Sequence, residues 1–284
     1  MTLNKVFSLA ALVGVALLAG PAMAESTALE PMDVHWSFEG PFGHYDQEQL
    51  QRGYEVYKEV CSSCHAMNQV AFRNLGDPGG PFYDPKYPNS NDNPKVKAIA
   101  AQYKVADIDP DSGDSIKREA TTADYFPAPF ANGAAAAAAN GGAIPPDMSL
   151  LVKAREGGAA YIYSVVMGDT ATAPAGTTLP PGKYYDRFKS GDMSANYHGD
   201  MSKMPEGGLI AMPPPLIDGR VTYDDKTVAS VDQEAKDVSA FLQWAADPKM
   251  EERKQMGLAV MIFLFVFACL VYSSYRRIWA KVGH

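Results

Sequence analysis

The sequence has little cysteine, with three residues in a chain of 284. One of them, Cys269, lies inside an apolar run, where a thiol behaves as a small hydrophobic side chain. The other two, Cys61 and Cys64, are separated by two residues. No further cysteine is left for a disulfide framework, so something else must hold the fold together.

Basic residues are in the minority, with 25 Lys and Arg against 33 Asp and Glu. Within residues 25–250 the counts are 19 and 31, which gives this segment a net charge of −12. This balance disfavours nucleic acid as a partner, and fits either a basic protein partner or simply a soluble acidic surface. Alternating strand patterns are also few, so the segment is expected to be mostly helical with long irregular connections.

Long apolar runs are confined to the two ends of the chain. Near the start, Lys5 precedes an apolar stretch at 6–18, and Ala22-Met23-Ala24 forms a small-x-small cleavage site. These features predict a secretory signal peptide that is removed after Ala24. A retained membrane anchor is the alternative, and the shortness of the run argues against it.

The second run, 256–272, holds 17 uncharged residues, the short end of the roughly 17–25 residues that span a bilayer. A buried core helix is the alternative. Charged residues at 251–254, and the aromatic and basic residues after the run, favour a membrane helix with a cytoplasmic C-terminus. The predicted organisation is a signal peptide (1–24), an exported domain (25–250), a transmembrane anchor (251–275) and a short cytoplasmic tail (276–284).

Cys61-Ser62-Ser63-Cys64-His65 matches the signature for covalent attachment of a c-type haem. At this spacing the two sulfurs reach the two vinyl groups of one porphyrin, and the adjacent His65 points its imidazole at the iron. A redox dithiol or half of a zinc site would compete. A dithiol leaves His65 unexplained, and a zinc site needs further ligands, for which only four histidines remain: His35, His44, His198 and His284.

Two helices are predicted to flank this site. Asp46 can cap the first, whose apolar face leads to Cys61, and Gly53 beside that face indicates close approach of another helix. Ser230 with Gln233 marks the start of the second, at about 230–246. The two are expected to cross beside the haem. The predicted fold is a mostly α, cytochrome c-like haem domain with long loops and one C-terminal transmembrane helix.

The sixth iron ligand decides between a carrier and a catalyst, because a filled position leaves the iron no open site. Met212 is the best candidate, since it precedes three prolines that fix the backbone. Met201, Met204 and His198 are the alternatives.

Several further motifs extend the pattern. In order they are NGGAIPPDMS at 140–149, KAREGG at 153–158, MPPP at 212–215, DVSAFLQWAA at 237–246 and RKQMGL at 253–258. Together with the motif at 61–65, they closely resemble the cytochrome c1 family, the haem subunits of ubiquinol–cytochrome c oxidoreductase (the cytochrome bc1 complex). The resemblance runs from about residue 35 to the C-terminus.

The resemblance implies one covalently bound haem c, with His65 and Met212 as axial ligands. It also implies Arg155 near a haem propionate, and Asn140, Pro145 and Pro146 in the pocket wall. Many bacterial members brace the loop before the ligand Met with a second cysteine pair. This chain has none, which leaves the path of 170–211 open.

The implied function is single-electron transfer from the Rieske iron–sulfur protein to a soluble, basic cytochrome c, beside cytochrome b in a respiratory or photosynthetic chain. The implied location is the bacterial inner membrane, with the haem domain in the periplasm. The chain is then an electron carrier, and enzyme activity belongs to the complex. The alternatives are a free-standing membrane-tethered cytochrome c, and a haem enzyme or sensor with an open iron.

Overall fold

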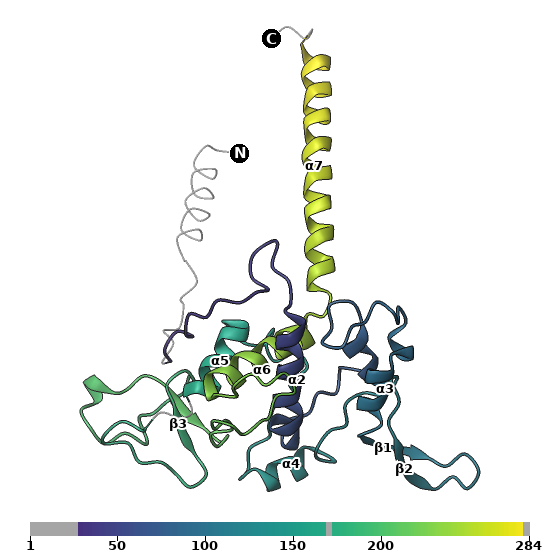
Figure 1. The fold of residues 1–284 in the computed structure, drawn as a ribbon. Helices are drawn as coiled ribbons and strands as arrows, with labels where there is room; N and C mark the ends of the chain where they lie inside the picture. Colours follow the sequence, from purple (N-terminus) through teal and green to yellow (C-terminus); the bar gives the residue numbers. More distant parts are fainter. Residues whose placement is uncertain (1–27, 169–171, 281–284) are drawn as a thin grey trace, which may run out of the picture.

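The computed structural model describes residues 28–168 and 172–280, so the expected signal peptide at 1–24 lies outside the described residues. The predicted fold class is confirmed: the described chain is mostly helical, with few strands and one long apolar helix at its C-terminal end (Figure 1). The α-helices are α2 (Gln47–Glu59), α3 (Pro94–Ala100), α4 (Gly133–Ala139), α5 (Gly158–Gly168), α6 (Val231–Ala246) and α7 (Met250–Trp279). The short 3₁₀ helices are Cys61–Ser63, Phe72–Gly76, Ser90–Asp92 and Met201–Lys203. The strands are β1 (Lys104–Ile108), β2 (Ser115–Glu119), β3 (Tyr184–Asp186) and β4 (Gly208–Ile210).

Helix α2 begins where the sequence predicts. The Asp46 carboxylate accepts hydrogen bonds from the backbone amides of Glu48 and Gln49, which satisfies donors that have no partner within the helix. The helix buries Leu50, Tyr54 and Tyr57 on one face. Because α2 ends at Glu59, the cysteine motif at 61–65 begins directly after this buried helix, next to the core.

Helix α6 crosses α2 at very close range. The Ser230 hydroxyl caps its start by accepting from the Gln233 amide at 3.2 Å, as predicted. The prediction that Gly53 marks a close helix contact is also confirmed: a Cβ there would stand 2.6 Å from the Cβ of Phe241. On its other side α6 packs against α5. These three helices form the framework of the domain.

Aromatic side chains fill the core around this crossing. Tyr57 packs on Phe241 with ring centroids 5.8 Å apart, and Phe241 in turn stacks on Trp244. Phe126 joins the cluster from the loop before α4, 5.9 Å from Tyr57. All four side chains are almost fully buried, so the core lies directly behind the cysteine motif.

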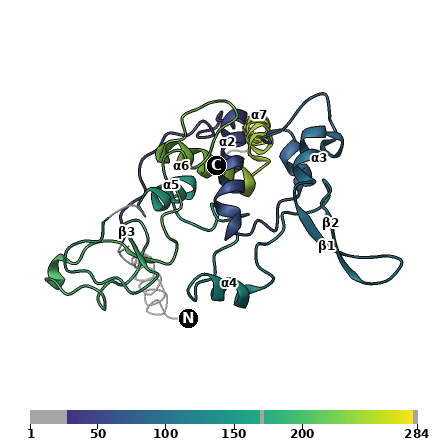
Figure 2. The same cartoon turned by 60° about the horizontal axis from the view of Figure 1, so that its bottom comes forward.

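Two antiparallel ribbons lie on opposite sides of the helices (Figure 2). In one, β1 pairs with β2 and Lys104 stands opposite Glu119. The acidic turn at 109–114 joins these two strands into a hairpin. In the other ribbon, β3 pairs with β4 and Tyr184 stands opposite Ile210.

Helix α7 leaves the domain and runs away from it as a single straight rod (Figure 1). Only Asp247, Pro248 and Lys249 separate it from α6. Among the described residues it is the one helix long and apolar enough to cross a membrane, and that apolar stretch is not buried against the domain. The helix contains the predicted run 256–272 and extends beyond it at both ends.

Candidate cofactor site

The cysteine motif occupies a tight turn at the end of α2. Both Cys64 and His65 donate backbone hydrogen bonds to the Cys61 carbonyl, at 3.1 and 2.9 Å. Cys61 is half-buried and packs against the hydrophobic core, while Cys64 is half-buried and lines a cavity. The turn thus places two thiols and one imidazole within five consecutive residues.

The His65 imidazole is held in a defined orientation. Its Nδ1 lies 2.9 Å from the carbonyl oxygen of Pro146, and because that oxygen only accepts, Nδ1 carries the proton. Burial lowers the pKa of His65, which favours the neutral ring. A neutral imidazole with a protonated Nδ1 leaves the Nε2 lone pair available for a metal.

The segment that holds His65 is itself fastened to the residues after the motif. The Met148 amide donates to the Ala66 carbonyl at 2.8 Å, and the Asn68 amide donates to the Asp147 carboxylate at 2.9 Å. The buried Ser149 hydroxyl accepts from the Gln69 amide at 3.0 Å. The predicted pocket residues Pro145 and Pro146 therefore sit at a fixed place against the motif.

A cavity of about 280 Å³ opens beside Cys64 and His65. Its lining is largely apolar and comes from α5, from the 140–151 segment and from the loop after β4. Seven of the eight predicted site residues line it, the exception being Cys61 on the core side. The seven are Cys64, His65, Asn140, Pro145, Pro146, Arg155 and Met212.

Met212 reaches the cavity from the end of the β3–β4 ribbon. Strand β4 ends at Ile210, and Ile210, Ala211, Met212 and Pro213 all line the cavity. The alternative ligands Met201, Met204 and His198 do not line it. Pairing of β4 with β3 shows how a chain without a second cysteine pair supports this loop.

Two cationic side chains stand at the cavity, one predicted and one missed. Arg155 is exposed, and its guanidinium donates to the Ala154 carbonyl at 2.9 Å. Lys189, just after β3, also lines the cavity. No sequence signal marks Lys189, because its position depends on the β3–β4 pairing. The apolar wall from α5, including Ile162 and Val165, also forms part of the site without a sequence signal that marks it.

A buried carboxylate lies under the ribbon that carries Met212. Asp186, at the end of β3, is fully buried and accepts from the Phe188 amide at 2.7 Å through Oδ1. Its Oδ2 has no hydrogen-bond partner among the described residues. Burial raises the pKa of Asp186 to about 6.

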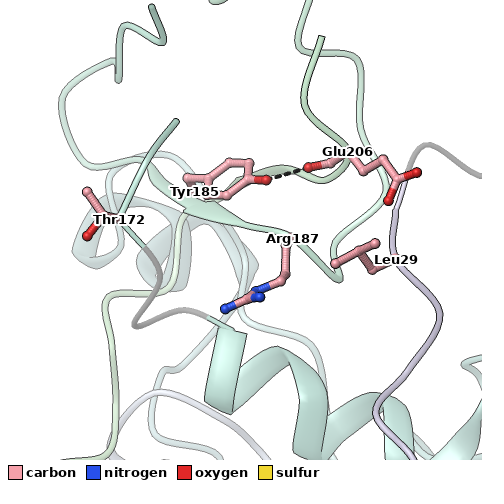
Figure 3. Close-up of a pocket in the computed structure, with 5 residues that line it drawn as sticks. All are labelled: Leu29, Thr172, Tyr185, Arg187 and Glu206. Atoms are coloured by element: carbon pink, nitrogen blue, oxygen red, sulfur yellow. Dashed lines mark hydrogen bonds between the residues drawn. The ribbon is translucent and has the colours of Figure 1, made fainter. Parts of the chain in front are cut away.

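A second cavity, of about 420 Å³, lies beside the same ribbon and includes Tyr185 of β3 in its lining. Leu29, Thr172, Tyr185, Arg187 and Glu206 line it, and the Tyr185 hydroxyl donates to the Glu206 carbonyl (Figure 3). It contains no thiol, imidazole or thioether, so it lacks the donor set that the first cavity offers.

The donor set of the first cavity fits a haem. It combines a neutral imidazole, a thioether and a thiol with an apolar lining and cations at its edge, as a porphyrin with two propionates requires. Among the described residues, no group of three or more His, Cys, Asp or Glu is placed to hold a bare metal ion. The residues that line the cavity therefore suit a haem iron, whose porphyrin supplies the other ligands, better than a bare metal ion.

Comparisons with known proteins agree with this chemistry. A model of the Cytochrome C1 family matches residues 36–282. Cytochrome c1 of Rhodospirillum rubrum is 41% identical, over 95% of both chains. A protein named cytochrome b/c1 from Bradyrhizobium diazoefficiens is also 41% identical over 94% of this chain, which spans 39% of that longer protein. The mitochondrial cytochrome b-c1 complex catalytic subunit of Candida albicans is 37% identical, over 94% of this chain and 83% of its own.

The family match covers most of the chain, and it includes both the cavity and α7. The relative from Rhodospirillum rubrum matches almost end to end at an identity well above that of chance resemblance. This chain belongs to the cytochrome c1 family.

Proposed function

We propose that the chain is a membrane-anchored electron carrier that holds one haem c. Cys61 and Cys64 would form the thioether links to it, and His65 and Met212 would hold its iron. The observation that carries this proposal is the convergence of Cys64, His65 and Met212 on one largely apolar cavity. When bound there, the haem supplies a one-electron couple between ferric and ferrous iron.

The residues of the chain have separate tasks in this proposal. The Pro146 carbonyl orients His65. Met212 would be the second protein ligand of the iron, which would raise the reduction potential and exclude small ligands. Arg155 and Lys189 offer positive charge for the propionates. The apolar wall, with Asn140, Pro145 and Pro146 at its edge, excludes water from the porphyrin face.

The proposed role is to accept an electron from the Rieske iron–sulfur protein and to pass it to a soluble cytochrome c. The chain does this as a subunit of a ubiquinol–cytochrome c oxidoreductase, next to cytochrome b. The names of two relatives, cytochrome b/c1 and the cytochrome b-c1 complex catalytic subunit, support membership of such a complex. The net charge of −12 on residues 25–250 suits a basic acceptor.

We further propose that α7 crosses the bacterial inner membrane once, with residues 25–250 in the periplasm and 276–284 in the cytoplasm. Arg276 and Arg277 lie in the last turn of the helix, on the side that the positive-inside rule assigns to the cytoplasm. Protease added to spheroplasts should degrade the haem domain and spare a tag placed after His284. Protection of the haem domain would reverse the assignment.

A test of the function uses the purified full chain. A pyridine haemochrome assay should report one haem with both vinyl groups saturated, and carbon monoxide should not bind the reduced protein. Mild detergent extraction should copurify it with cytochrome b and a Rieske protein. Rapid carbon monoxide binding would favour an enzyme or sensor with an open iron, and isolation without partners would favour a free-standing cytochrome c.

A further inference from the structure

Residues 37–44, here named the Phe42 loop, are flanked on both sides by buried aromatic side chains. Before the loop, Trp36 is buried and stacks on Phe38, with ring centroids 5.3 Å apart. After it, Tyr45 is buried and packs on Phe38 at 5.7 Å. The base of the loop is therefore part of the core, and only its tip is free to point outward.

The loop closes tightly on itself. The His44 amide donates to the Ser37 carbonyl at 3.0 Å, and Gly40 adopts a φ of +69°, which favours glycine. A Cβ on Gly43 would stand 2.0 Å from the Glu39 carbonyl oxygen, so the two arms touch backbone to backbone. This closure displays Phe42 at the tip, with 79% of its surface exposed.

The first turns of α7 hold this loop in place. The Lys254 ammonium donates to the Phe38 carbonyl at 2.6 Å and to the Gly43 carbonyl at 3.2 Å. The Tyr45 amide donates to the Glu251 carboxylate at 2.7 Å. Both arms of the loop are thus fastened to the helix, and the position of Phe42 along α7 is fixed.

That position is the start of the apolar part of α7. Lys254 is the last charged residue before the uncharged run 256–272. Figure 1 shows the loop rising beside the lower end of α7, in the direction in which the helix leaves the domain. A chain that changes from charged to apolar at this point meets the polar surface of a bilayer there. Apolar side chains such as Trp, Phe and Leu of membrane-bound amphipathic segments are buried at this boundary between headgroups and acyl chains.

We infer that Phe42 is a second membrane contact of this chain, inserted into the interfacial layer of the bilayer beside α7. The inference rests on the proposed crossing of α7. A lipid surface fits better than a protein partner, because one aromatic side chain on a short Gly-Pro-Phe-Gly tip offers far less than the roughly 800 Å² that each side of a stable protein interface buries. Together the loop and the helix attach the domain to the bilayer at two points.

The test uses the full haem-loaded chain in nanodiscs of phosphatidylcholine and phosphatidylglycerol, with trifluoromethylphenylalanine placed at position 42. Fluorine relaxation is measured with a lipid that carries a nitroxide at its headgroup, and separately with a water-soluble nickel chelate. Position 125 is the matched control, because Tyr125 is 51% exposed and its backbone pairs with Ala71, outside both the Phe42 loop and α7. The headgroup nitroxide should broaden position 42 several-fold more than position 125, and the nickel chelate should do the reverse.

Equal behaviour of positions 42 and 125 overturns the inference. A label at Phe265, within α7, separates this result from failure of the anchor itself. If a nitroxide deep in the acyl chains does not broaden position 265, the proposed membrane crossing fails. In the assembled complex, protection of position 42 from both reagents would show that a protein subunit covers it, which also overturns the lipid contact.

Discussion

A Cβ built on Gly53 would stand 2.1 Å from the carbonyl oxygen of Asp237, so α2 and α6 meet with no room for any side chain. This contact sets the angle at which α2 delivers Cys61, Cys64 and His65. Gly53→Ala should therefore destabilise the domain by about 1–3 kcal/mol or more, as overpacking of a core does. Urea unfolding of the haem-loaded protein measures it. Gly133→Ala is the control, since a Cβ there meets only Ile144, at 3.4 Å, and equal stability of both variants would contradict the prediction.

The same crossing holds a buried ion pair. The Arg52 Nε donates to Asp237 at 3.0 Å, and the Asp237 side chain is fully buried. Arg52→Met leaves this carboxylate without its cation and should cost about 3–5 kcal/mol. Burial already raises the pKa of Asp237, so the loss should be larger at pH 8 than at pH 5. Lys104→Met, which breaks an exposed pair with Glu119, should cost under about 1 kcal/mol.

The Met212→Leu substitution tests whether the protein is an electron carrier with a closed iron or a catalyst with an open one. The swap conserves volume, so its packing cost should stay under about 1.5 kcal/mol. The variant should keep its covalent haem, lose the weak red charge-transfer band of ferric iron–sulfur ligation, fall in reduction potential and bind carbon monoxide. Met201→Leu and Met204→Leu should do none of this, because neither residue lines the cavity. An unchanged band in Met212→Leu would show that another residue is the sixth ligand.

Asp186 should make stability depend on pH in a particular direction. Its pKa is raised to about 6, above the roughly 3.9 of an unfolded Asp. The folded state therefore binds this proton more tightly, and the destabilising effect of the carboxylate grows between about pH 4 and 6 and is fully present above pH 6. Asp186→Asn should gain stability relative to the wild type across this range. Asp192→Asn, whose parent carboxylate is exposed and has a lowered pKa, should show the opposite slope.

Association with a basic cytochrome c should slow steeply as salt rises. The charge of −12 on residues 25–250 attracts a positive partner, and salt screens this attraction over about 10 Å at 0.1 M. Stopped-flow rates across a salt series measure the effect. Candidate docking residues are Asp107, Asp109, Asp111, Asp114, Asp224 and Asp225. Asp107 and Asp225 already pair with Arg118 and Arg52, so substituting Asp111 and Asp114 should slow association more. A rate independent of salt would remove electrostatic steering.

Features set by local physics could be predicted from the sequence. The caps at Asp46 and Ser230 act within three residues, and the apolar run in α7 follows from composition alone. Gly53 could be interpreted because glycine inside a helix lowers its stability, and close packing against another helix is the usual compensation. Cys61, Cys64 and His65 were found from their short motif and Met212 from the prolines that follow it, whereas the other four site residues came only from the resemblance to the cytochrome c1 family.

The parts that were missed depend on pairing between distant segments. Neither strand of the β1–β2 hairpin has a buried face, so no alternation of apolar and polar residues marks it. Strands β3 and β4 have three residues each, too few for a periodic signal. Because Lys189 reaches the cavity only through that pairing, its place there could not be predicted from sequence.

The three-residue junction between α6 and α7 also has a kinetic consequence. A domain on a long linker samples many positions before it meets a partner. Here only three residues join the domain to α7, and the Lys254 hydrogen bond fastens the two together again. The cavity beside His65 is therefore a stationary target. In the proposed function, any travel that electron delivery or removal requires is then made by the donor and the acceptor rather than by this chain.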